Sequence, residues 1–448
     1  MSALLRTLVT IIGVAVVIAL GVLAWFVFAP GPMDFAQGGH VELSAYKGAD
    51  PTGVPVELAK ASLLERGEYL TRAADCESCH TAKGGVPFAG GLAFKLPFGA
   101  IYSSNITPDR ETGIGAWTDA EFLSALHKGV GRGGKPLYPA MPYASYTYLT
   151  DADALAIKAY LFSLKPVRSE TPANTLSFPY NQRWLMTIWS AMFNPNRRFE
   201  PNTAQTAQWN RGAYLAEGLA HCGECHTPRN LLQATDNRRK FSGALTSGWR
   251  AYNITADKTA GIGAWSDDEI AQFLSTGHAL GRGVAGGPMG EAVDLSLRFL
   301  TAGDIKAIVA YLKTVPAMAT PGLPAPKITP APAAPKEGVV AGVDPMGKHI
   351  FEGACASCHD WNGSGSLTAY AALTGNRAVN DPGATNVAQM VIAGTREQTP
   401  KGPVFMPAFG AAYSDAEIAA VANYVTARFG AGGSRLTAHD VAELRQMN

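Results

Sequence analysis

The chain has 448 residues, a formal net charge of +1 at pH 7, and 16% charged residues. This balance of charges excludes the basic surface typical of nucleic-acid binding, so we expect no nucleic-acid partner, and it excludes an acidic solvating tail. Length predicts about three domains at roughly 150 residues each. The 48 glycines and 29 prolines predict many loops between short helices.

The first element is an apolar stretch at 7–28, which contains no charged residue. About 20 such residues cross a bilayer as a helix, and Arg6 precedes the stretch on the expected cytoplasmic side. A cleaved signal is the alternative, but the stretch is longer than a usual signal core, and Ala29 is followed by Pro30. We therefore expect residues 1–33 to be a retained transmembrane anchor, with the remainder outside the cytoplasm.

Helical patterns next lead into three similar short motifs. They are CESCH at 76–80, CGECH at 222–226 and CASCH at 355–359. A longer repeat follows the first two motifs, because 105–121 and 253–269 agree at 11 of 17 positions. The sequence therefore predicts two duplicated units and a smaller third unit.

An amphipathic helix is expected to close each unit, at 151–164, 302–315 and 414–429. These helices carry tyrosines at matching places, which are Tyr160, Tyr311 and Tyr424. Between the first two units, 181–193 has one apolar stripe, made of Leu185, Ile188, Trp189, Met192 and Phe193. This stripe indicates a helix that packs between domains, or a face for the membrane or a partner subunit. Residues 316–335 hold seven prolines and predict an extended spacer that tethers the third unit.

The C-x-x-C-H motif admits three kinds of chemistry. A zinc site needs four ligands at a fixed separation, and these motifs lie more than 130 residues apart. A redox dithiol would follow a strand, whereas the flanks here are helical. The adjacent histidine decides between them, because C-x-x-C-H is the attachment signature of c-type haem, and the motifs contain all six cysteines of the chain. We therefore expect three covalent haems, bound by Cys76, Cys79, Cys222, Cys225, Cys355 and Cys358, with His80, His226 and His359 as iron ligands.

The sixth iron ligand is expected to be a methionine in each unit. Met141 and Met406 each precede a proline, just before a closing helix, and Met289 follows a proline. Prolines fix loops that lack regular hydrogen bonds, which suits a ligand held over a porphyrin. His127 and His278 are rivals, but they do not occupy equivalent positions, so we interpret them as surface histidines.

Two further residue pairs repeat in the first two units. Arg132 and Arg282 could pair with haem propionates or lie in solvated loops. Trp117 and Trp265 are expected to pack near a porphyrin edge or in the ordinary core.

The predicted fold class is mostly α, with three tandem cytochrome c domains behind the N-terminal transmembrane helix. Loops such as 84–116 and 228–264 are expected to wrap one haem edge. The expected boundaries after the anchor are domain 1 at 34–168, a connector at 169–205, domain 2 at 206–316, a Pro/Ala-rich linker at 317–343, domain 3 at 344–430 and a tail at 431–448. Residues 34–59 within domain 1 are expected to form an irregular stalk.

With these motifs the chain resembles the tri-haem cytochrome c subunits of bacterial membrane-bound dehydrogenases. Those complexes oxidise alcohols, aldehydes, sugars or sugar acids in the periplasm. The most particular pieces are NITPDRETGIGAW at 105–117 and LYPAMPYASY at 137–146. The resemblance implies that a catalytic dehydrogenase subunit supplies electrons and that this chain delivers them through its haems to ubiquinone. It implies a body in the periplasm at the cell inner membrane and methionine ligation by Met141 and Met406, less directly by Met289. The N-terminal apolar stretch departs from relatives that have cleaved signals or a C-terminal helix.

The resemblance leaves the catalytic partner open among quinoproteins, flavoproteins and molybdenum hydroxylases. The stretch STGHALGRGVAGGPM at 275–289 is most similar to cytochromes that accompany molybdenum aldehyde-type dehydrogenases. We expect a non-catalytic electron-transfer subunit, without catalytic residues of its own. The alternatives are a haem peroxidase-like enzyme, which needs an iron with an open position, and a cytochrome c subunit of a terminal oxidase.

Overall fold

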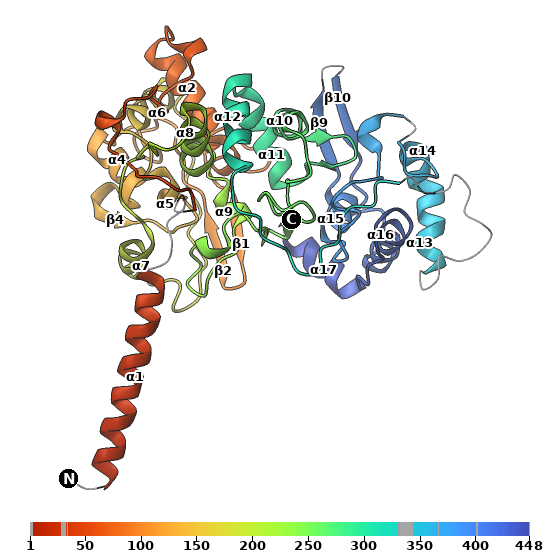
Figure 1. Ribbon diagram of the computed structural model, residues 1–448, viewed down its shortest axis with the longest axis horizontal. Coiled ribbons are helices and arrows are strands. Elements are labelled where there is room, and N and C mark those ends of the chain that lie inside the picture. Colours follow the sequence, from red (N-terminus) through yellow and green to blue (C-terminus); the bar gives the residue numbers. More distant parts are fainter. Residues whose placement is uncertain are drawn as a thin grey trace.

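The computed structural model describes residues 3–27, 33, 35–329, 331, 344–365, 367–399 and 402–447. The described part is mostly helical, as expected from the sequence, and its strands form five two-stranded antiparallel hairpins. The hairpins were not expected, and two of them lie in the predicted loops 84–116 and 228–264. Figure 1 shows a body built of helices and loops, with one long helix projecting from it.

The projecting helix is α1 (Ala3–Val27). Its segment Ala3–Trp25 has a mean hydropathy of 2.7 and is uncovered by the body. Among the described residues it is the helix whose length and composition fit a membrane span or a signal sequence. The possible cleavage position at Ala29 lies outside the described residues.

A crossed pair of helices forms the frame of each unit. The pairs are α2 (Leu63–Ala73) with α6 (Asp151–Ser163), α8 (Ala207–Ala213) with α12 (Ala302–Leu312), and α13 (Pro345–Ile350) with α16 (Asp415–Phe429). At each crossing a glycine faces a backbone carbonyl. A Cβ atom would lie 2.1 Å from the Ala156 oxygen if placed on Gly67, 1.9 Å from the Ala307 oxygen on Gly212, and 2.1 Å from the Ala420 oxygen on Gly347. The Cβ atoms of the matching tyrosines, Tyr160, Tyr311 and Tyr424, flank these crossings. We refer to residues 63–168, 206–316 and 344–447 as the first, second and third units.

The first two units have the same order of elements. The first contains α3 (Cys76–Cys79), β1 (Ala93–Leu96), β2 (Gly99–Tyr102), α4 (Asp119–Lys128), β3 (Val130–Gly131), β4 (Lys135–Pro136) and α5 (Tyr143–Tyr146). The second contains η4 (Tyr214–Leu219), α9 (Gly223–His226), β5 (Ala244–Thr246), β6 (Trp249–Ala251), α10 (Asp267–Thr276), β7 (His278–Ala279), β8 (Gly283–Val284) and α11 (Pro288–Leu295). Helices α4 and α10 both begin with a capping box, Thr118 with Glu121 and Ser266 with Glu269, as their repeated sequence requires.

The third unit is built differently after its motif. It contains η7 (Phe351–Cys355), α14 (Ala356–His359), η8 (Ala369–Ala371), α15 (Thr385–Ala393), β9 (Thr395–Thr399), β10 (Gly402–Met406) and α17 (Ala438–Met447). Short 3₁₀ turns elsewhere are η1 (Leu43–Ala45), η2 (Val56–Leu58), η3 (Arg132–Gly134), η5 (Asn237–Arg239) and η6 (Leu297–Phe299). This unit has a hydrophobic core of its own, whereas the first two units share one continuous core.

The first two units are joined by reciprocal hydrogen bonds. Tyr69 of α2 donates to Asp304 of α12 at 2.6 Å, and the equivalent Tyr214 donates to Asp153 of α6 at 2.6 Å. Each aspartate lies in the first turn of its helix. The exchange relates the two units by an approximate twofold axis and buries both phenols.

The segment expected as a stalk on the first unit lies across both units. Gly53 donates its N–H to Asp153 of the first unit, whereas Arg211 of the second unit donates to the carbonyls of Pro51 and Gly53. The hydroxyl of Tyr46 accepts from Asn210 of the second unit. The stalk therefore holds the first two units together.

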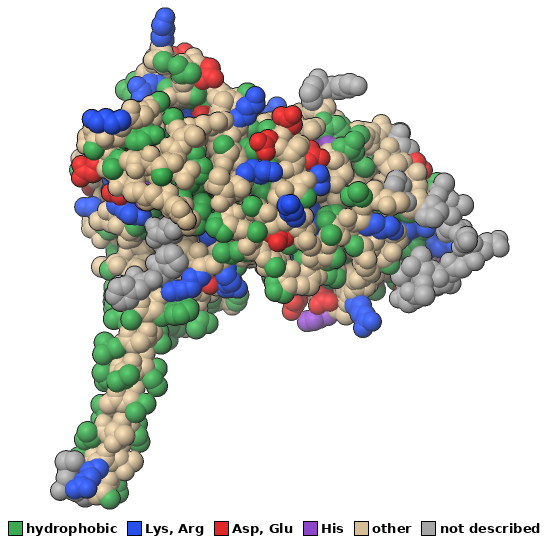
Figure 2. Space-filling model, viewed as in Figure 1, with side chains coloured by type: hydrophobic (Ala, Val, Ile, Leu, Met, Phe, Trp, Pro, Cys, Tyr) green, Lys and Arg blue, Asp and Glu red, His purple; other side chains and the backbone are tan. Residues whose placement is uncertain are grey.

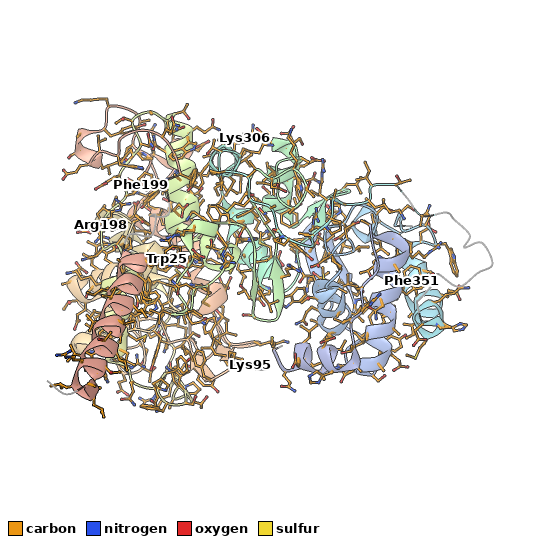
Figure 3. All side chains as sticks on the ribbon, turned by 60° about the horizontal axis from the view of Figure 1, so that its bottom comes forward. Trp25, Lys95, Arg198, Phe199, Lys306 and Phe351 are labelled. Atoms are coloured by element: carbon orange, nitrogen blue, oxygen red, sulfur yellow. The ribbon has the colours of Figure 1, made fainter. Side chains whose placement is uncertain are left out.

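The third unit docks mainly on the second unit. Arg250 of β6 pairs with Asp381 at 3.3 Å, and its backbone exchanges two hydrogen bonds with the Asn386 side chain. The hairpin β1–β2 of the first unit reaches the third unit through Lys95, which donates to the carbonyl of Gln446 in α17 at 2.9 Å (Figure 3). The linker expected at 317–343 includes 330 and 332–343, which lie outside the described residues.

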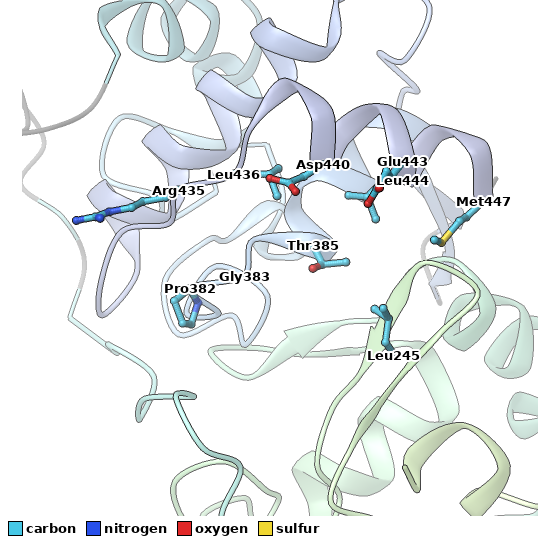
Figure 4. A pocket seen from close by; sticks show the side chains of 10 residues that line it. All are labelled: Leu245, Pro382, Gly383, Thr385, Arg435, Leu436, Asp440, Glu443, Leu444 and Met447. Atoms are coloured by element: carbon cyan, nitrogen blue, oxygen red, sulfur yellow. The ribbon is translucent and has the colours of Figure 1, made fainter. Parts of the chain in front are cut away.

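The predicted C-terminal tail forms α17, which packs on α15 and α16 and buries Val441 and Leu444. It is an integral part of the third unit. A shallow, open pocket lies between α17, the turn before α15 and Leu245 of β5 (Figure 4).

The helix between the units, α7 (Leu185–Phe193), packs through one side and leaves another exposed. Trp189 is buried, contacts Tyr143 and donates its indole N–H to the carbonyl of Leu232 at 2.8 Å. Ile188 and the preceding Trp184 remain 51% and 60% exposed. The packing role expected for this helix is confirmed for Trp189 and not for Ile188.

We expect Gly347→Ala to destabilise the third unit by roughly 1–3 kcal/mol, because its new Cβ would overlap the Ala420 carbonyl. The matched control is Gly353→Ala in η7, where a Cβ meets no atom within 4 Å and alanine favours the helix by about 0.5–1 kcal/mol. Urea unfolding followed by far-ultraviolet circular dichroism measures both variants. Equal midpoints would contradict the tight crossing.

Candidate haem-attachment sites

The cysteines of each motif lie on or beside one short helical turn, as the C-x-x-C spacing requires. All six cysteine residues are partly buried. In the first two units the residue before the first cysteine has a left-handed backbone, with φ of 51° at Asp75 and 36° at His221. This turn separates the attachment helix from the preceding helix of the frame.

Each motif histidine makes the same kind of hydrogen bond, from its ring to a backbone carbonyl. Nδ1 of His80 lies 2.7 Å from the carbonyl oxygen of Ser104, Nδ1 of His226 lies 2.6 Å from that of Tyr252, and Nδ1 of His359 lies 2.6 Å from that of Ala371. A carbonyl oxygen can accept but not donate, so Nδ1 carries the hydrogen in each case. The tautomer of all three side chains is therefore fixed with Nε2 free.

A second bond fixes the backbone of each histidine. The N–H groups of Gly90, Gly243 and Gly365 donate to the carbonyls of His80, His226 and His359 at 2.7, 2.8 and 3.1 Å. These glycines have φ of 72°, 91° and 82°, which non-glycine residues rarely adopt. Each histidine is therefore held through its ring and through its main chain.

Burial keeps the motif histidines neutral. It lowers the pKa of His80, His226 and His359, while the hydrogen bond to the backbone carbonyl opposes this shift. A neutral imidazole whose Nδ1–H is bound to a carbonyl presents Nε2 as a metal ligand. The three histidines thus fit an iron ligand.

Four of the motif thiols are held in the protonated form. Burial raises the pKa of Cys76 and Cys222 to about 12 and that of Cys225 and Cys355 to about 11. Across the described ranges, no group of three or more His, Cys, Asp or Glu side chains converges as metal ligands. The arrangement matches covalent attachment of a porphyrin by paired thiols, with iron bound at Nε2.

The candidate methionines lie in three different local structures. Met141 lies in the turn before α5, Met289 in the first turn of α11, and Met406 at the end of β10. Met141 and Met289 pack against the core that Cys76 and Cys222 also contact, and Met406 packs against the third unit's core together with Cys355. Met406 shares a core with the third motif alone, whereas the continuous core of the first two units does not decide which of their two motifs Met141 or Met289 serves.

The prediction that His127 and His278 lie on the surface is wrong. Both side chains are 4% exposed. Nδ1 of His127 lies 3.7 Å from Asp151 at the start of α6, and the ring of His278 lies 4.4 Å from that of Tyr370 in the third unit. Each is buried because another element packs over the end of its own helix.

The repeated arginines and tryptophans have protein partners. Arg132 lies 3.8 Å from Glu121, and Arg282 pairs with the equivalent Glu269 at 3.0 Å. The tryptophans are tied to the closing helices, because Lys158 donates to the Trp117 carbonyl at 2.9 Å and Lys313 donates to the Trp265 carbonyl at 2.8 Å. The arginines thus bind the helix caps of their own units.

Sequence reasoning missed the glycines and the carbonyls that hold the histidines. A signal was available in the first two units, because Phe88 and Phe241, both buried, each stand two residues before such a glycine. A sequence signal for the residues that supply the carbonyls in the first two units also existed, because Ser104 and Tyr252 directly precede the repeated asparagines at 105 and 253. No comparable signal marks Ala371 in the third unit.

Tyr252 links the middle site to the third unit. Its carbonyl accepts from His226, and its hydroxyl donates to the buried Asp381 at 3.1 Å. Burial and the nearby carboxylate raise the pKa of Tyr252, so its hydroxyl stays protonated. One residue therefore contacts both an iron-ligand candidate and the docking surface.

Comparison with known proteins decides the family. A family model described as cytochrome c matches residues 346–428. The fructose dehydrogenase cytochrome subunit of Gluconobacter japonicus is 38% identical over 89% of this chain and 85% of its own length. The gluconate 2-dehydrogenase cytochrome c subunit of Pantoea cypripedii is 37% identical over 87% and 90%. This chain belongs to the family of cytochrome c subunits of dehydrogenases.

A further relative is longer than this chain. It is one of the subunits of the nicotinate dehydrogenase of Pseudomonas putida, and it is 40% identical over 83% of this chain, which spans 31% of that relative's length. As a member of this family, the chain is a c-type cytochrome with covalent haem c and serves as the electron-transfer subunit of a dehydrogenase complex.

We expect His127 to make stability depend on pH. Burial lowers its pKa from 6.5 to about 4, so the unfolded chain takes up a proton that the folded chain refuses. The free energy of unfolding is therefore undiminished above pH 6.5 and falls as pH drops from 6.5 to about 4, by at most roughly 3 kcal/mol.

His127→Gln should flatten this part of the profile, measured as urea midpoints across a pH series. The matched control is His439→Gln, because the His439 side chain is 81% exposed. A slope unchanged by His127→Gln would contradict the burial effect.

Proposed function

We propose that the chain carries three haem c groups and passes electrons from a catalytic dehydrogenase subunit to ubiquinone. The observation that carries this proposal is the identical fixation of three histidines, each with Nδ1 bound to a carbonyl and its own carbonyl bound to a glycine N–H. A motif without function would not need to preserve both bonds in three units. The family supports the electron-transfer role and the dehydrogenase partner.

Each unit would hold its haem with its own residues. Cys76 and Cys79, Cys222 and Cys225, and Cys355 and Cys358 would form the thioethers. His80 with Met141, His226 with Met289, and His359 with Met406 would bind the irons. When bound, such six-coordinate haems supply one-electron redox chemistry. The chain's own contribution is to orient the ligands and bury them.

The three units would be three tandem cytochrome c domains with the boundaries given above. The repeated glycine–carbonyl crossing supports this assignment, including in the third unit, where the connecting elements differ. The contacts described above modify two boundaries. Segment 34–59 serves the first two units together, and 431–448 belongs to the third.

We propose that α1 is retained as a single-pass anchor in the inner membrane and that the body lies in the periplasm. The uncovered apolar surface of α1 supports this location. Anchoring would keep the haems close to ubiquinone, which is itself confined to the bilayer.

The catalytic partner is proposed to be a molybdenum aldehyde-type dehydrogenase, on the similarity of the stretch 275–289. The relatives are named as subunits of nicotinate, fructose and gluconate dehydrogenases, so similarity to this family does not fix the substrate. Gentle detergent purification followed by mass spectrometry identifies the partner. Recovery of a flavin- or quinone-dependent subunit instead would overturn the molybdenum assignment alone.

Replacing His226 with alanine should lower the haem content from three to two per chain, because the middle iron loses its ligand. Pyridine haemochrome absorbance measures this content. His278→Ala is the matched control: it removes another buried histidine of the second unit, and it should leave three haems. Three haems in His226→Ala would contradict the assignment of the middle site.

Replacing Met141 with histidine should lower one of three midpoint potentials, because a thioether ligand raises the potential relative to imidazole. A potentiometric titration of the haem absorbance shows this shift. In the reduced unaltered protein, carbon monoxide should not bind rapidly, since every iron has two ligands. Rapid binding at one haem would favour the peroxidase-like alternative.

A further inference from the structure

The foot of α1 lies against the body at its last turns. Trp25 is 60% exposed, and the guanidinium of Arg238 lies 3.7 Å from the centre of its indole ring. Arg238 also donates to the Trp25 carbonyl at 3.0 Å. Figure 3 shows Trp25 at the end of α1 that meets the underside of the body. Because the rest of α1 is uncovered, the bilayer must end close to this contact if α1 spans it.

Large apolar side chains are exposed on two segments beside this foot. One is the turn and helix at 178–188, and the other is the loop at 231–232. We call them the foot patch, which consists of Phe178, Tyr180, Trp184, Ile188, Leu231 and Leu232, exposed by 77%, 45%, 60%, 51%, 94% and 42%. Helix α7 contacts α1, and Figure 2 shows hydrophobic side chains on the underside of the body next to α1.

The foot patch is held in a fixed shape. Tyr180 stacks on Phe98 with ring centres 3.8 Å apart. Trp189 of α7 donates to the carbonyl of Leu232, so the helix and the loop are tied to each other. Exposure of these residues is therefore a property of the fold and not of a loose chain end.

Basic side chains border the patch at the level of Trp25. A groove between α1 and the segment 229–239 is lined by Val22, Trp25, Leu231, Arg229 and Arg239. The positive charges of the two arginines are partly neutralised by ion pairs: Arg229 lies 2.7 Å from Glu224, and Arg239 lies 3.0 Å from Asp236. Arginine and tryptophan at the end of an apolar helix are typical of the headgroup region of a bilayer.

We propose that the foot patch is buried in the headgroup region of the periplasmic leaflet, so that the body rests on the membrane surface. The proposal rests on the anchor role proposed above for α1. An exposed cluster of aromatic and aliphatic residues rarely faces water, and this one adjoins the apolar surface of α1, which the body leaves uncovered. The second unit and the connector before it, which carry the patch, would then lie against the bilayer, with α7 and the loop at 231–232 as the points of contact.

Site-specific photocrosslinking tests the proposal on the full-length holoprotein in phospholipid nanodiscs. Benzoylphenylalanine is placed at Leu231 or, as the matched control, at Val56, which is 82% exposed in η2. The red-orange segment of Figure 1 to which η2 belongs lies at the end of the body away from α1. After irradiation, mass spectrometry should find phospholipid adducts at position 231 at least tenfold more often than at position 56. Haem content, measured in the same samples, reports that both variants are folded.

Equal numbers of lipid adducts at the two positions, or no adducts at position 231, would overturn the proposal that lipid covers the foot patch. Crosslinking of 231 to the catalytic subunit in the purified complex would also overturn it, because the face would then belong to a protein partner. Intact mass of the same samples reports whether residues 1–33 are retained. The anchor and the patch can therefore fail separately, since adducts at 231 report lipid contact whether or not α1 is present.

Discussion

The hydrogen bond from Nδ1 of each motif histidine to a backbone carbonyl is the constraint on which the remaining structure depends. It selects the tautomer that leaves Nε2 free, and burial keeps the ring neutral. In the first two units the carbonyl comes from a residue just past a hairpin: Ser104 is the second residue after β2, and Tyr252 is the first after β6. The third unit delivers it from the 3₁₀ turn η8. Different scaffolds therefore satisfy one chemical requirement.

The frame that supports these bonds is the crossed helix pair. Its closeness depends on a glycine, because any side chain would meet a carbonyl oxygen at about 2 Å. The first two pairs are further joined by the exchanged bonds of Tyr69 with Asp304 and Tyr214 with Asp153. These buried phenol–carboxylate bonds fix the angle between the units more firmly than apolar packing alone, since an unpaired buried group would be costly. The third unit keeps its own core and attaches through polar contacts.

Features that depend on residues close together in the chain could be predicted from the sequence. The motif spacing, the repeat and the closing helices each depend on residues close together in the chain, and the structure places them as expected. Burial of His127 and His278 was not predictable, because it depends on tertiary packing: Asn194 donates to the carbonyl of His127, and Tyr370 of the third unit lies against the ring of His278. The carbonyl acceptors were missed for a related reason: a backbone oxygen has no residue identity. The contact of segment 34–59 with both units likewise depends on how the units pack.

Tyr252 takes part both in orienting the middle histidine and in joining the second and third units. Its peptide orients the imidazole of His226, and its phenol binds Asp381 across the junction. A displacement of Tyr252 would therefore move both the acceptor of the middle imidazole and one hydrogen bond of the junction. The geometry of the middle site thus depends on how the third unit is seated on the second.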